Sequence, residues 1–176
     1  GTPNWGKGWK QAVLKHYNHS IMISLHGSSQ AARQNYADLD PTYRDAWGQP
    51  LLRITFDFPQ NDIKMAAHVT AKGVEIGKAM GAKQVAGSPR KGPYTVTQYQ
   101  TTHNTGGTVM GDNPKTSVVN RYLQSWDVPN VFVIGASNYP QQASWNPTGT
   151  LGALTYWAID ALKNKYLKNP GRLVSV

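Results

Sequence analysis

The chain has 176 residues, with 18 Lys and Arg against nine Asp and Glu, and its formal net charge is +9. A hydrophobic content of 39% is sufficient for a folded core, whereas 17 glycines and 11 prolines argue against a simple helical bundle. The absence of cysteine excludes disulfides, thiol nucleophiles and thiolate metal sites, and no apolar run is long enough for a transmembrane span.

The first half of the chain alternates periodic segments with polar loops. A short amphipathic stretch over residues 9–17 predicts a helix. Apolar residues alternate with other residues over 20–26 and again over 51–58, which predicts two strands that neighbour each other in an antiparallel sheet. The segment between residues 27 and 48 is polar and rich in turn residues, which predicts a loop.

A longer helix and a third strand follow. Asn61 and Asp62 offer an N-cap for a helix that continues to about Met80, and Gly81 is a suitable stop. Residues 94–100 alternate again and predict a strand.

The second half contains a short apolar strand, predicted over residues 130–134, and a final helix from about Gly149 to Leu167. Pro170 and Gly171 end this helix. The order strand, strand, helix, strand, strand, helix predicts an α+β fold, an antiparallel sheet with helices on one side.

Two polar loops carry the candidate chemistry. In the first, over residues 102–111, His103 leaves a strand and meets Gly106 and Gly107, where the backbone can approach a ligand closely. In the second, over 135–150, Asn146 or Thr148 is a candidate cap for the last helix, whose free N–H groups favour an anion. Taken alone, each loop also has a structural explanation: a turn whose imidazole bonds the backbone, and ordinary helix capping.

Together, the two loops and the segments between them resemble the C-terminal region of the glucose–methanol–choline (GMC) flavin oxidoreductases over residues 101–165. The matching elements, in order, are His103, Gly106, Val118-Val119-Asn120, Asn130 to Ser137, Pro140 and Asn146-Pro147-Thr148, followed by an alanine-containing helix. Residues 1–100 look more narrowly like the flavoprotein large subunits of bacterial gluconate, ketogluconate, sorbitol and fructose dehydrogenases.

The resemblance implies oxidation of a sugar, polyol or sugar-acid hydroxyl with FAD as cofactor. By resemblance, His103 takes the hydroxyl proton while hydride passes to flavin N5, and Asn146 hydrogen-bonds the same oxygen. Gly135 and Ala136 are then expected to contact the cofactor.

The last helix supplies further expected contacts. Pro147 and Thr148 bring its N-terminus to the flavin. Trp145 and Asn104 are candidates for the substrate face, and Asn104 is also an alternative to His103, because the loop is one residue longer than in some relatives. We expect no metal site.

The family's dinucleotide fingerprint, G-x-G-x-x-G after a strand, is absent from the chain. We therefore expect the C-terminal part of a longer or divided enzyme, without its N-terminal dinucleotide-binding part. Residues 1–100 would form most of the substrate-binding sheet domain, and residues 101–176 the catalytic and flavin-contacting segment with the strand and helix that complete the flavin domain.

Partners and compartment follow only from the narrower resemblance, which implies a cytochrome c, small subunits and a periplasmic enzyme peripheral to the membrane. Two alternatives stay open: a sugar oxidase of the same family that uses oxygen, and a basic module that binds nucleic acid or an acidic protein. Because no three consecutive Lys or Arg occur, the charge excess is better explained by an anionic sugar acid, cofactor phosphates or an acidic subunit than by nucleic acid.

Overall fold

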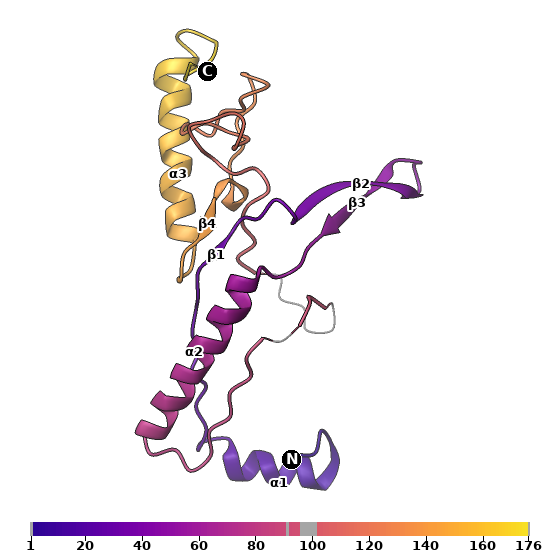
Figure 1. Ribbon diagram of the computed structural model, residues 1–176, viewed down its shortest axis with the longest axis vertical. Helices are drawn as coiled ribbons and strands as arrows, with labels where there is room; N and C mark the ends of the chain where they lie inside the picture. Colours follow the sequence, from indigo (N-terminus) through magenta and orange to yellow (C-terminus); the bar gives the residue numbers. More distant parts are fainter. Residues whose placement is uncertain (1, 91, 96–101, 176) are drawn as a thin grey trace. The chain divides into compact units, whose positions relative to one another are not determined.

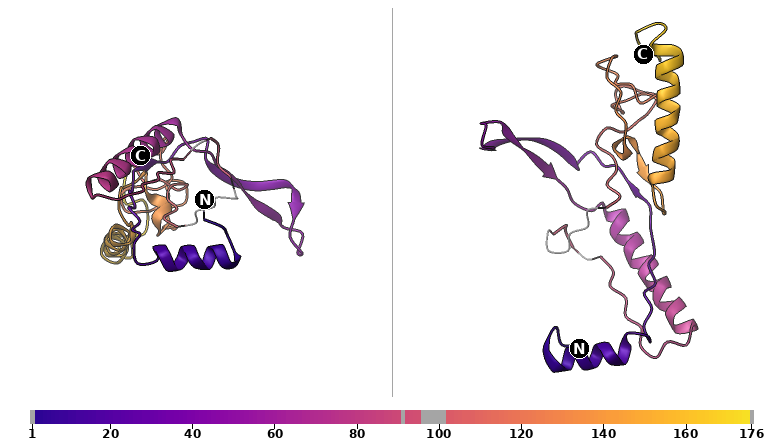
Figure 2. Two further views of the ribbon diagram at one scale, coloured as in Figure 1. Left: turned by 90° about the horizontal axis from the view of Figure 1, so that it is seen from below. Right: turned by 180° about the vertical axis from the view of Figure 1, so that it is seen from behind.

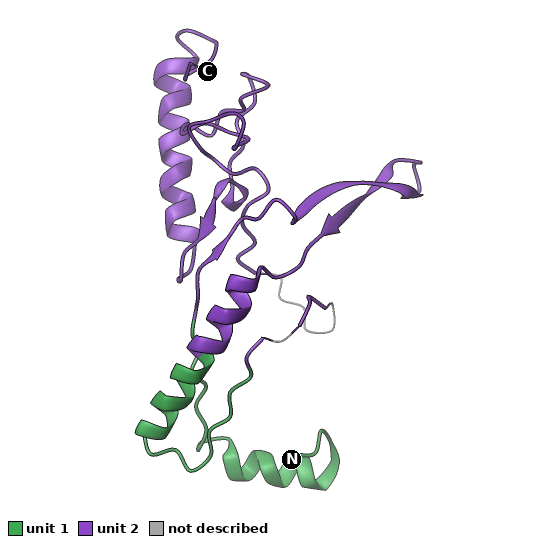
Figure 3. Cartoon of the chain, viewed as in Figure 1, with its two compact units in different colours: residues 1–25, 70–88 green, residues 26–69, 89–176 purple. Residues whose placement is uncertain are grey.

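The computed structural model describes residues 2–90, 92–95 and 102–175. It combines helices with short antiparallel strand pairs, which confirms the predicted α+β class (Figure 1). The chain divides into two compact units: Gly1–Leu25 with Thr70–Ser88, and His26–Val69 with Pro89–Val176 (Figure 3). Within the described residues, no helix is both long and apolar enough to cross a membrane.

Both N-terminal helices form close to their predicted bounds. Helix α1 spans Gly6–His16, and helix α2 spans Gln60–Ala79 and runs through both units. Helix α2 ends as expected at Gly81, which has a φ of +79°, while the next N–H, of Ala82, donates to the Gly77 carbonyl at 3.2 Å. Glycine tolerates this left-handed conformation, so it terminates the helix without steric cost.

The predicted strand over residues 20–26 is wrong, because this segment is irregular and the following strand β1 covers only Ser29–Gln30. Its apolar side chains pack against α2 instead of a sheet. A Cβ atom built at Gly73 would lie 2.8 Å from Leu25 Cδ1, and one at Gly77 would lie 3.8 Å from Ile23 Cδ1. Gly73 and Gly77 lie one helical turn apart and have no side chains, so Leu25 and Ile23 can pack closely against this face of α2.

Strand β3, Pro50–Thr55, confirms most of the predicted strand over 51–58, but its partner is not the one expected. It pairs with β2, Tyr36–Arg44, in antiparallel register with Leu39 opposite Leu52, so the loop predicted over 27–48 is wrong there. Strand β2 reads as polar because one face carries Asp38, which forms an ion pair with Arg53 of β3.

The strand predicted over 130–134 is also wrong. Phe132 forms only an isolated bridge with Gln124, and Val133 N–H donates to the Leu123 carbonyl at 2.9 Å. Too few consecutive residues pair for a strand to form. For the strand predicted over 94–100, Tyr94 and Thr95 are not in a strand, and residues 96–100 lie outside the described residues.

Helix α3 spans Thr148–Ala161 and continues as a π-helical turn, η3, over Leu162–Tyr166, close to the predicted helix. Its N-cap position is Pro147, with no side-chain cap, so the predicted capping by Asn146 or Thr148 is wrong. The Pro147 carbonyl accepts the first intrahelical bond, from Leu151 N–H at 3.0 Å, so the N-cap position falls on a residue whose side chain has no hydrogen-bonding group.

The buried core lies where α3 packs against residues between 110 and 133. Figures 1 and 2 show α3 beside this segment of the chain. Trp157 of α3 stacks on Tyr122 with ring centroids 5.7 Å apart, and its Nε1 donates to the Arg121 carbonyl at 2.9 Å. The residues buried in this part of the chain are Val119, Asn120, Tyr122, Leu123, Gln124, Trp126, Asn138, Tyr139, Gln142, Pro147, Ala158 and Ala161.

A second short sheet joins β1 to the loop before α3. Ser29 of β1 lies opposite Gln142 of β4, Gln141–Gln142, in antiparallel register, and Figure 1 labels the two strands side by side. The pairing continues where Ala31 N–H donates to the Pro140 carbonyl at 3.0 Å. This pairing anchors the second candidate loop, residues 135–150.

Candidate functional site

The two loops predicted from the sequence lie against each other. Thr108 N–H donates to the Ser137 carbonyl at 3.1 Å, and Met110 N–H donates to the Asn138 carbonyl at 2.8 Å. Ser137 and Asn138 belong to the short 3₁₀ turn η2, Ala136–Asn138. The structure thus brings the glycine-rich part of the first loop to the start of the second.

Side chains reinforce this backbone contact. Thr108 Oγ1 lies 2.8 Å from Ser137 Oγ and 3.2 Å from Asn138 Oδ1. Asn138 is fully buried, and its Nδ2 donates to the Val133 carbonyl at 2.6 Å. Sequence reasoning missed Thr108 and Asn138, because no local pattern distinguishes a polar residue that bonds a distant loop, as these half-buried and buried side chains do, from one that stays in a solvated loop.

Gly106 makes the close approach of the loops possible. Its φ is +81°, and a Cβ atom built there would lie 3.0 Å from Ala31 Cβ. Its N–H donates to the Ala136 carbonyl at 3.4 Å. Both the conformation and the space therefore favour glycine here, three residues after His103.

His103 is exposed and adopts a left-handed conformation with a φ of +63°. Its ring lies 6.4 Å from that of His26, centroid to centroid, at an interplanar angle of 45°. A non-glycine residue in this region is uncommon and carries backbone strain, which clusters at functional sites. No hydrogen bond joins the side chain of His103 to that of Asn146 within the described residues.

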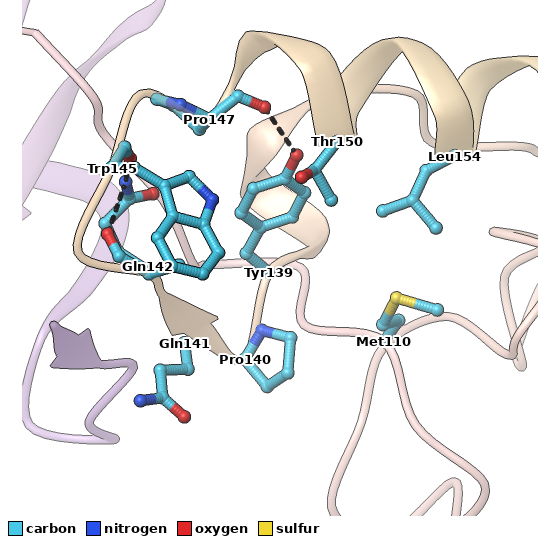
Figure 4. Close-up of a pocket in the computed structure, with 10 residues that line it drawn as sticks. Met110, Tyr139, Pro140, Gln141, Gln142, Trp145, Pro147, Thr150 and Leu154 are labelled. Carbon is cyan, nitrogen blue, oxygen red and sulfur yellow. Dashed lines mark hydrogen bonds between the residues drawn. The ribbon is translucent and has the colours of Figure 1, made fainter.

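The loop that carries Trp145 and Asn146 is held by buried polar groups (Figure 4). Gln142 Nε2 donates to the carbonyls of Ala143, at 3.1 Å, and Trp145, at 2.9 Å. Tyr139 Oη donates to the Pro147 carbonyl at 3.0 Å, and burial raises the pKa of this phenol, which favours the protonated form that donates. Trp145 and Asn146 are exposed on this supported loop.

Beside this loop lies a pocket of about 280 Å³, shown in Figure 4. Of the predicted site residues, it contains Trp145 and Pro147, whereas His103, Asn104, Asn146, Gly135, Ala136 and Thr148 lie outside its lining. The lining residues are Met110, Tyr139, Pro140, Gln141, Gln142, Ala143, Trp145, Pro147, Thr150 and Leu154. The pocket therefore adjoins the second candidate loop and the first turns of α3.

Two backbone features suit close contact with a ligand. Gly135 has a φ of 154° and a ψ of 172°, a combination that is essentially restricted to glycine. At the start of α3, the first intrahelical bond runs from Leu151 N–H to the Pro147 carbonyl at 3.0 Å. The N–H groups of residues 148–150 precede that bond, and these residues are exposed, so this helix end favours negative charge.

Comparisons with known proteins agree on one family. The GMC oxidoreductase C-terminal domain matches residues 31–155. The gluconate 2-dehydrogenase flavoprotein of Pantoea cypripedii is 57% identical over 99% of this chain and 29% of its own length. The 2-methyl-1,2-propanediol dehydrogenase of Mycolicibacterium austroafricanum is 31% identical over 92% of this chain, and the fructose dehydrogenase large subunit of Gluconobacter japonicus is 30% identical over 90%.

The chain covers 28% of the length of both the diol dehydrogenase and the fructose dehydrogenase large subunit. It therefore spans less than a third of the length of each of these three relatives. The family model, in contrast, covers well over half of this chain. The resemblance inferred from His103, Gly106 and the segment from Asn130 to Thr148 is therefore confirmed. The chain belongs to the GMC oxidoreductase family and contains its C-terminal domain.

Proposed function

We propose that the chain is the C-terminal part of an FAD-dependent dehydrogenase that oxidises a hydroxyl group of a sugar, polyol or sugar acid. The observation that carries this proposal is the 57% identity, over 99% of the chain, to a gluconate 2-dehydrogenase flavoprotein. Two further relatives are named as a diol dehydrogenase and a fructose dehydrogenase, which favours a dehydrogenase over an oxidase.

In this proposal His103 is the general base and Asn146 is a hydrogen-bond donor to the reacting oxygen. The substrate hydroxyl loses its proton to the His103 imidazole, its carbon loses a hydride, and a carbonyl forms. The Asn146 amide cannot take a proton, but its N–H groups stabilise the negative charge that develops on the oxygen. The exposure and the strained backbone of His103 support an active role.

The residues around α3 fit a flavin. When bound, FAD supplies the acceptor for the hydride. The N–H groups at Thr148 and the next two residues would face the negative charge of a reduced flavin ring, with Pro147 setting the start of the helix. At Gly149 no other atom lies within 4 Å of a built Cβ, so a planar ring system has room to approach. Gly135 and Ala136 would contact the cofactor through their backbone.

Residues 101–176 would then form the catalytic and flavin-contacting segment, and residues 1–100 most of the substrate sheet. An N-terminal part would hold the dinucleotide. Helix α3 supports this arrangement: Tyr156 is 82% exposed and Ile159 is 41% exposed, and a helix that is apolar on several sides is normally covered. Cytochrome c, small subunits and a periplasmic location at the membrane surface complete the proposal, and the relative named as a large subunit supports further subunits.

The test uses the complete flavoprotein with gluconate, fructose and 2-methyl-1,2-propanediol as candidate substrates. Anaerobic stopped-flow absorbance measures flavin reduction in the parent and in His103→Ala and Asn146→Ala. We expect His103→Ala to slow reduction by about 10²–10⁴-fold and Asn146→Ala by about 10²–10³-fold, with flavin content unchanged.

The matched control is His19→Ala, which removes an exposed imidazole in the other compact unit and should leave the reduction rate unchanged. Full activity in His103→Ala would overturn the catalytic assignment. Peroxide formed in air at the rate of substrate oxidation would indicate the oxidase alternative. Binding of nucleic acid that weakens steeply with salt, without flavin reduction by any candidate substrate, would favour the binding module.

A further inference from the structure

Two buried glutamines in this chain hold loops by the same pair of bonds, but only one of them has a partner for its oxygen. Gln124 Nε2 donates to the carbonyls of Pro129, at 2.7 Å, and Gly171, at 2.8 Å, while its Oε1 accepts from Asn120 Nδ2 and Leu173 N–H. Gln124 is therefore fully satisfied, as buried amides normally are.

Gln142 makes the same two donor bonds, to the carbonyls of Ala143 and Trp145, and is 8% exposed. Its Oε1 is buried and has no hydrogen-bond partner among the described residues. The orientation of the amide is set by the donors alone, because a flipped amide would turn its oxygen toward two carbonyl oxygens. The side-chain oxygen of Gln142 forms no stabilising hydrogen bond within the described part of the chain. The structural contribution of this side chain therefore comes from the two carbonyls that its Nε2 binds.

One of those carbonyls belongs to the peptide unit that joins Trp145 to Asn146. Because this unit is planar, a bond that fixes the Trp145 carbonyl also fixes the direction of the Asn146 N–H and the position of its Cα. Gln142 itself is held in β4, where it lies opposite Ser29 in the register with β1. A chain of contacts therefore runs from a paired strand through one amide to the backbone of Asn146.

We propose that Gln142 is a positioning residue for Asn146: it clamps the Ala143 and Trp145 carbonyls and aims the Asn146 amide at the reacting oxygen. This inference rests on the proposed function, in which Asn146 stabilises charge that develops in the transition state. A misdirected amide loses that interaction without losing the substrate. The effect therefore falls on the rate of flavin reduction rather than on substrate affinity.

The test is a double-mutant cycle in the complete flavoprotein, with Gln142→Met and Asn146→Ala alone and together. Methionine keeps the length of the side chain and removes both donors. We expect Gln142→Met to slow flavin reduction at saturating substrate by about 10- to 100-fold, with the half-saturating substrate concentration changed less than twofold. In the Asn146→Ala background the same substitution should have almost no further effect on the rate.

Gln124→Met is the matched control. It removes the same kind of bonds from a buried glutamine and is expected to lower stability, but its effect on the rate should be the same with and without Asn146. If Gln142→Met does not retain flavin, Gln142→Asn replaces it in the cycle, because it keeps the amide and shortens the reach by one methylene.

Additive effects of Gln142 and Asn146 substitutions, or an unchanged rate in Gln142→Met, would overturn the inference. The proposed function and the positioning role of Gln142 can be lost separately. Loss of the proposed function shows as normal flavin reduction in His103→Ala and Asn146→Ala. If those two variants are slow while Gln142→Met reduces its flavin at the parent rate, the positioning role alone is lost.

Discussion

The hydroxyl of Thr108 lies 3.2 Å from the amide oxygen of Asn138, and this contact joins two loops across 30 residues of sequence. Since an amide oxygen only accepts, Thr108 is the donor. Asn138 is fully buried, so water cannot take the place of the Thr108 hydroxyl as the hydrogen-bond donor to its amide oxygen. The pair is therefore a structural link between the loop of His103 and the turn that follows Gly135.

Thr108→Val removes this donor at constant side-chain volume. We expect the free energy of unfolding to fall by about 1–3 kcal/mol, because a buried acceptor is left without a partner. Urea denaturation of the complete flavoprotein measures the change. Thr116→Val is the control, since the Thr116 hydroxyl bonds only the nearby Asn113 carbonyl in an exposed turn. An equal effect of the two substitutions would contradict the prediction.

Gly106→Ala tests the close approach of the first loop to Ala31, the residue that follows β1. Gly107 is a matched control, because its φ of +95° imposes a similar backbone strain of about 1–2 kcal/mol on alanine but no other atom lies within 4 Å of its Cβ position. We expect Gly106→Ala to be more destabilising than Gly107→Ala, since its Cβ would also press on Ala31. Thermal unfolding of both variants gives the comparison, and equal melting temperatures would rule out a packing effect.

Tyr139→Phe should loosen the start of α3. The substitution removes the 3.0 Å bond to the Pro147 carbonyl and leaves the ring in place. We expect a loss of about 1 kcal/mol in unfolding free energy and faster amide hydrogen exchange in the first turns of the helix. Tyr43→Phe, at a 68% exposed position of β2, serves as the control. Unchanged exchange at residues 148–154 in Tyr139→Phe would contradict the role of this bond.

A hydrogen bond from Lys165 Nζ, 2.7 Å from the phenol oxygen, lowers the pKa of Tyr122. The ammonium group stabilises the phenolate, so the phenol loses its proton at a lower pH than an ordinary tyrosine. Lys165→Met should therefore move the titration of Tyr122 to higher pH. The absorbance difference between the parent and Tyr122→Phe isolates this residue, and Lys163→Met should not move it. A Tyr122 titration that is identical in parent and Lys165→Met would contradict the assignment.

His26 faces His103 at a ring separation of 6.4 Å, which places a second imidazole beside the proposed base. We expect His26→Ala to raise the substrate concentration needed for half-maximal flavin reduction several-fold, because it removes a polar group from the substrate side of His103. Steady-state kinetics with a dye acceptor measures the change, with His16→Ala of α1 as the control. Equal kinetics in His26→Ala and His16→Ala would contradict a position of His26 on the substrate side of the proposed base.

Local pattern predicted the elements that have a clear periodicity in the chain. The 3.6-residue periodicity and Gly81 are sufficient to predict α2, and the alternation after Pro50 is sufficient for β3. The loop residues His103, Gly106 and Asn146-Pro147-Thr148 also stand out, because their order and spacing resemble the family to which the comparisons assign the chain.

Long-range contacts decided the rest. The alternation of Ile23 and Leu25 is satisfied equally well by a sheet or by two glycines on a helix, and only the packing against Gly73 and Gly77 distinguishes them. Strand β2 carries Asp38, whose cost in a strand is offset by Arg53 across the pair.

The amino-acid sequence by itself determined the α+β class, the helices and the family, because these depend on periodicity and on residues close together in the chain. Only the tertiary structure showed that Asn138 and Gln142 are buried, that Thr108 is half-buried, and what these side chains hold, because the burial of a polar side chain depends on partners that the chain brings from far away.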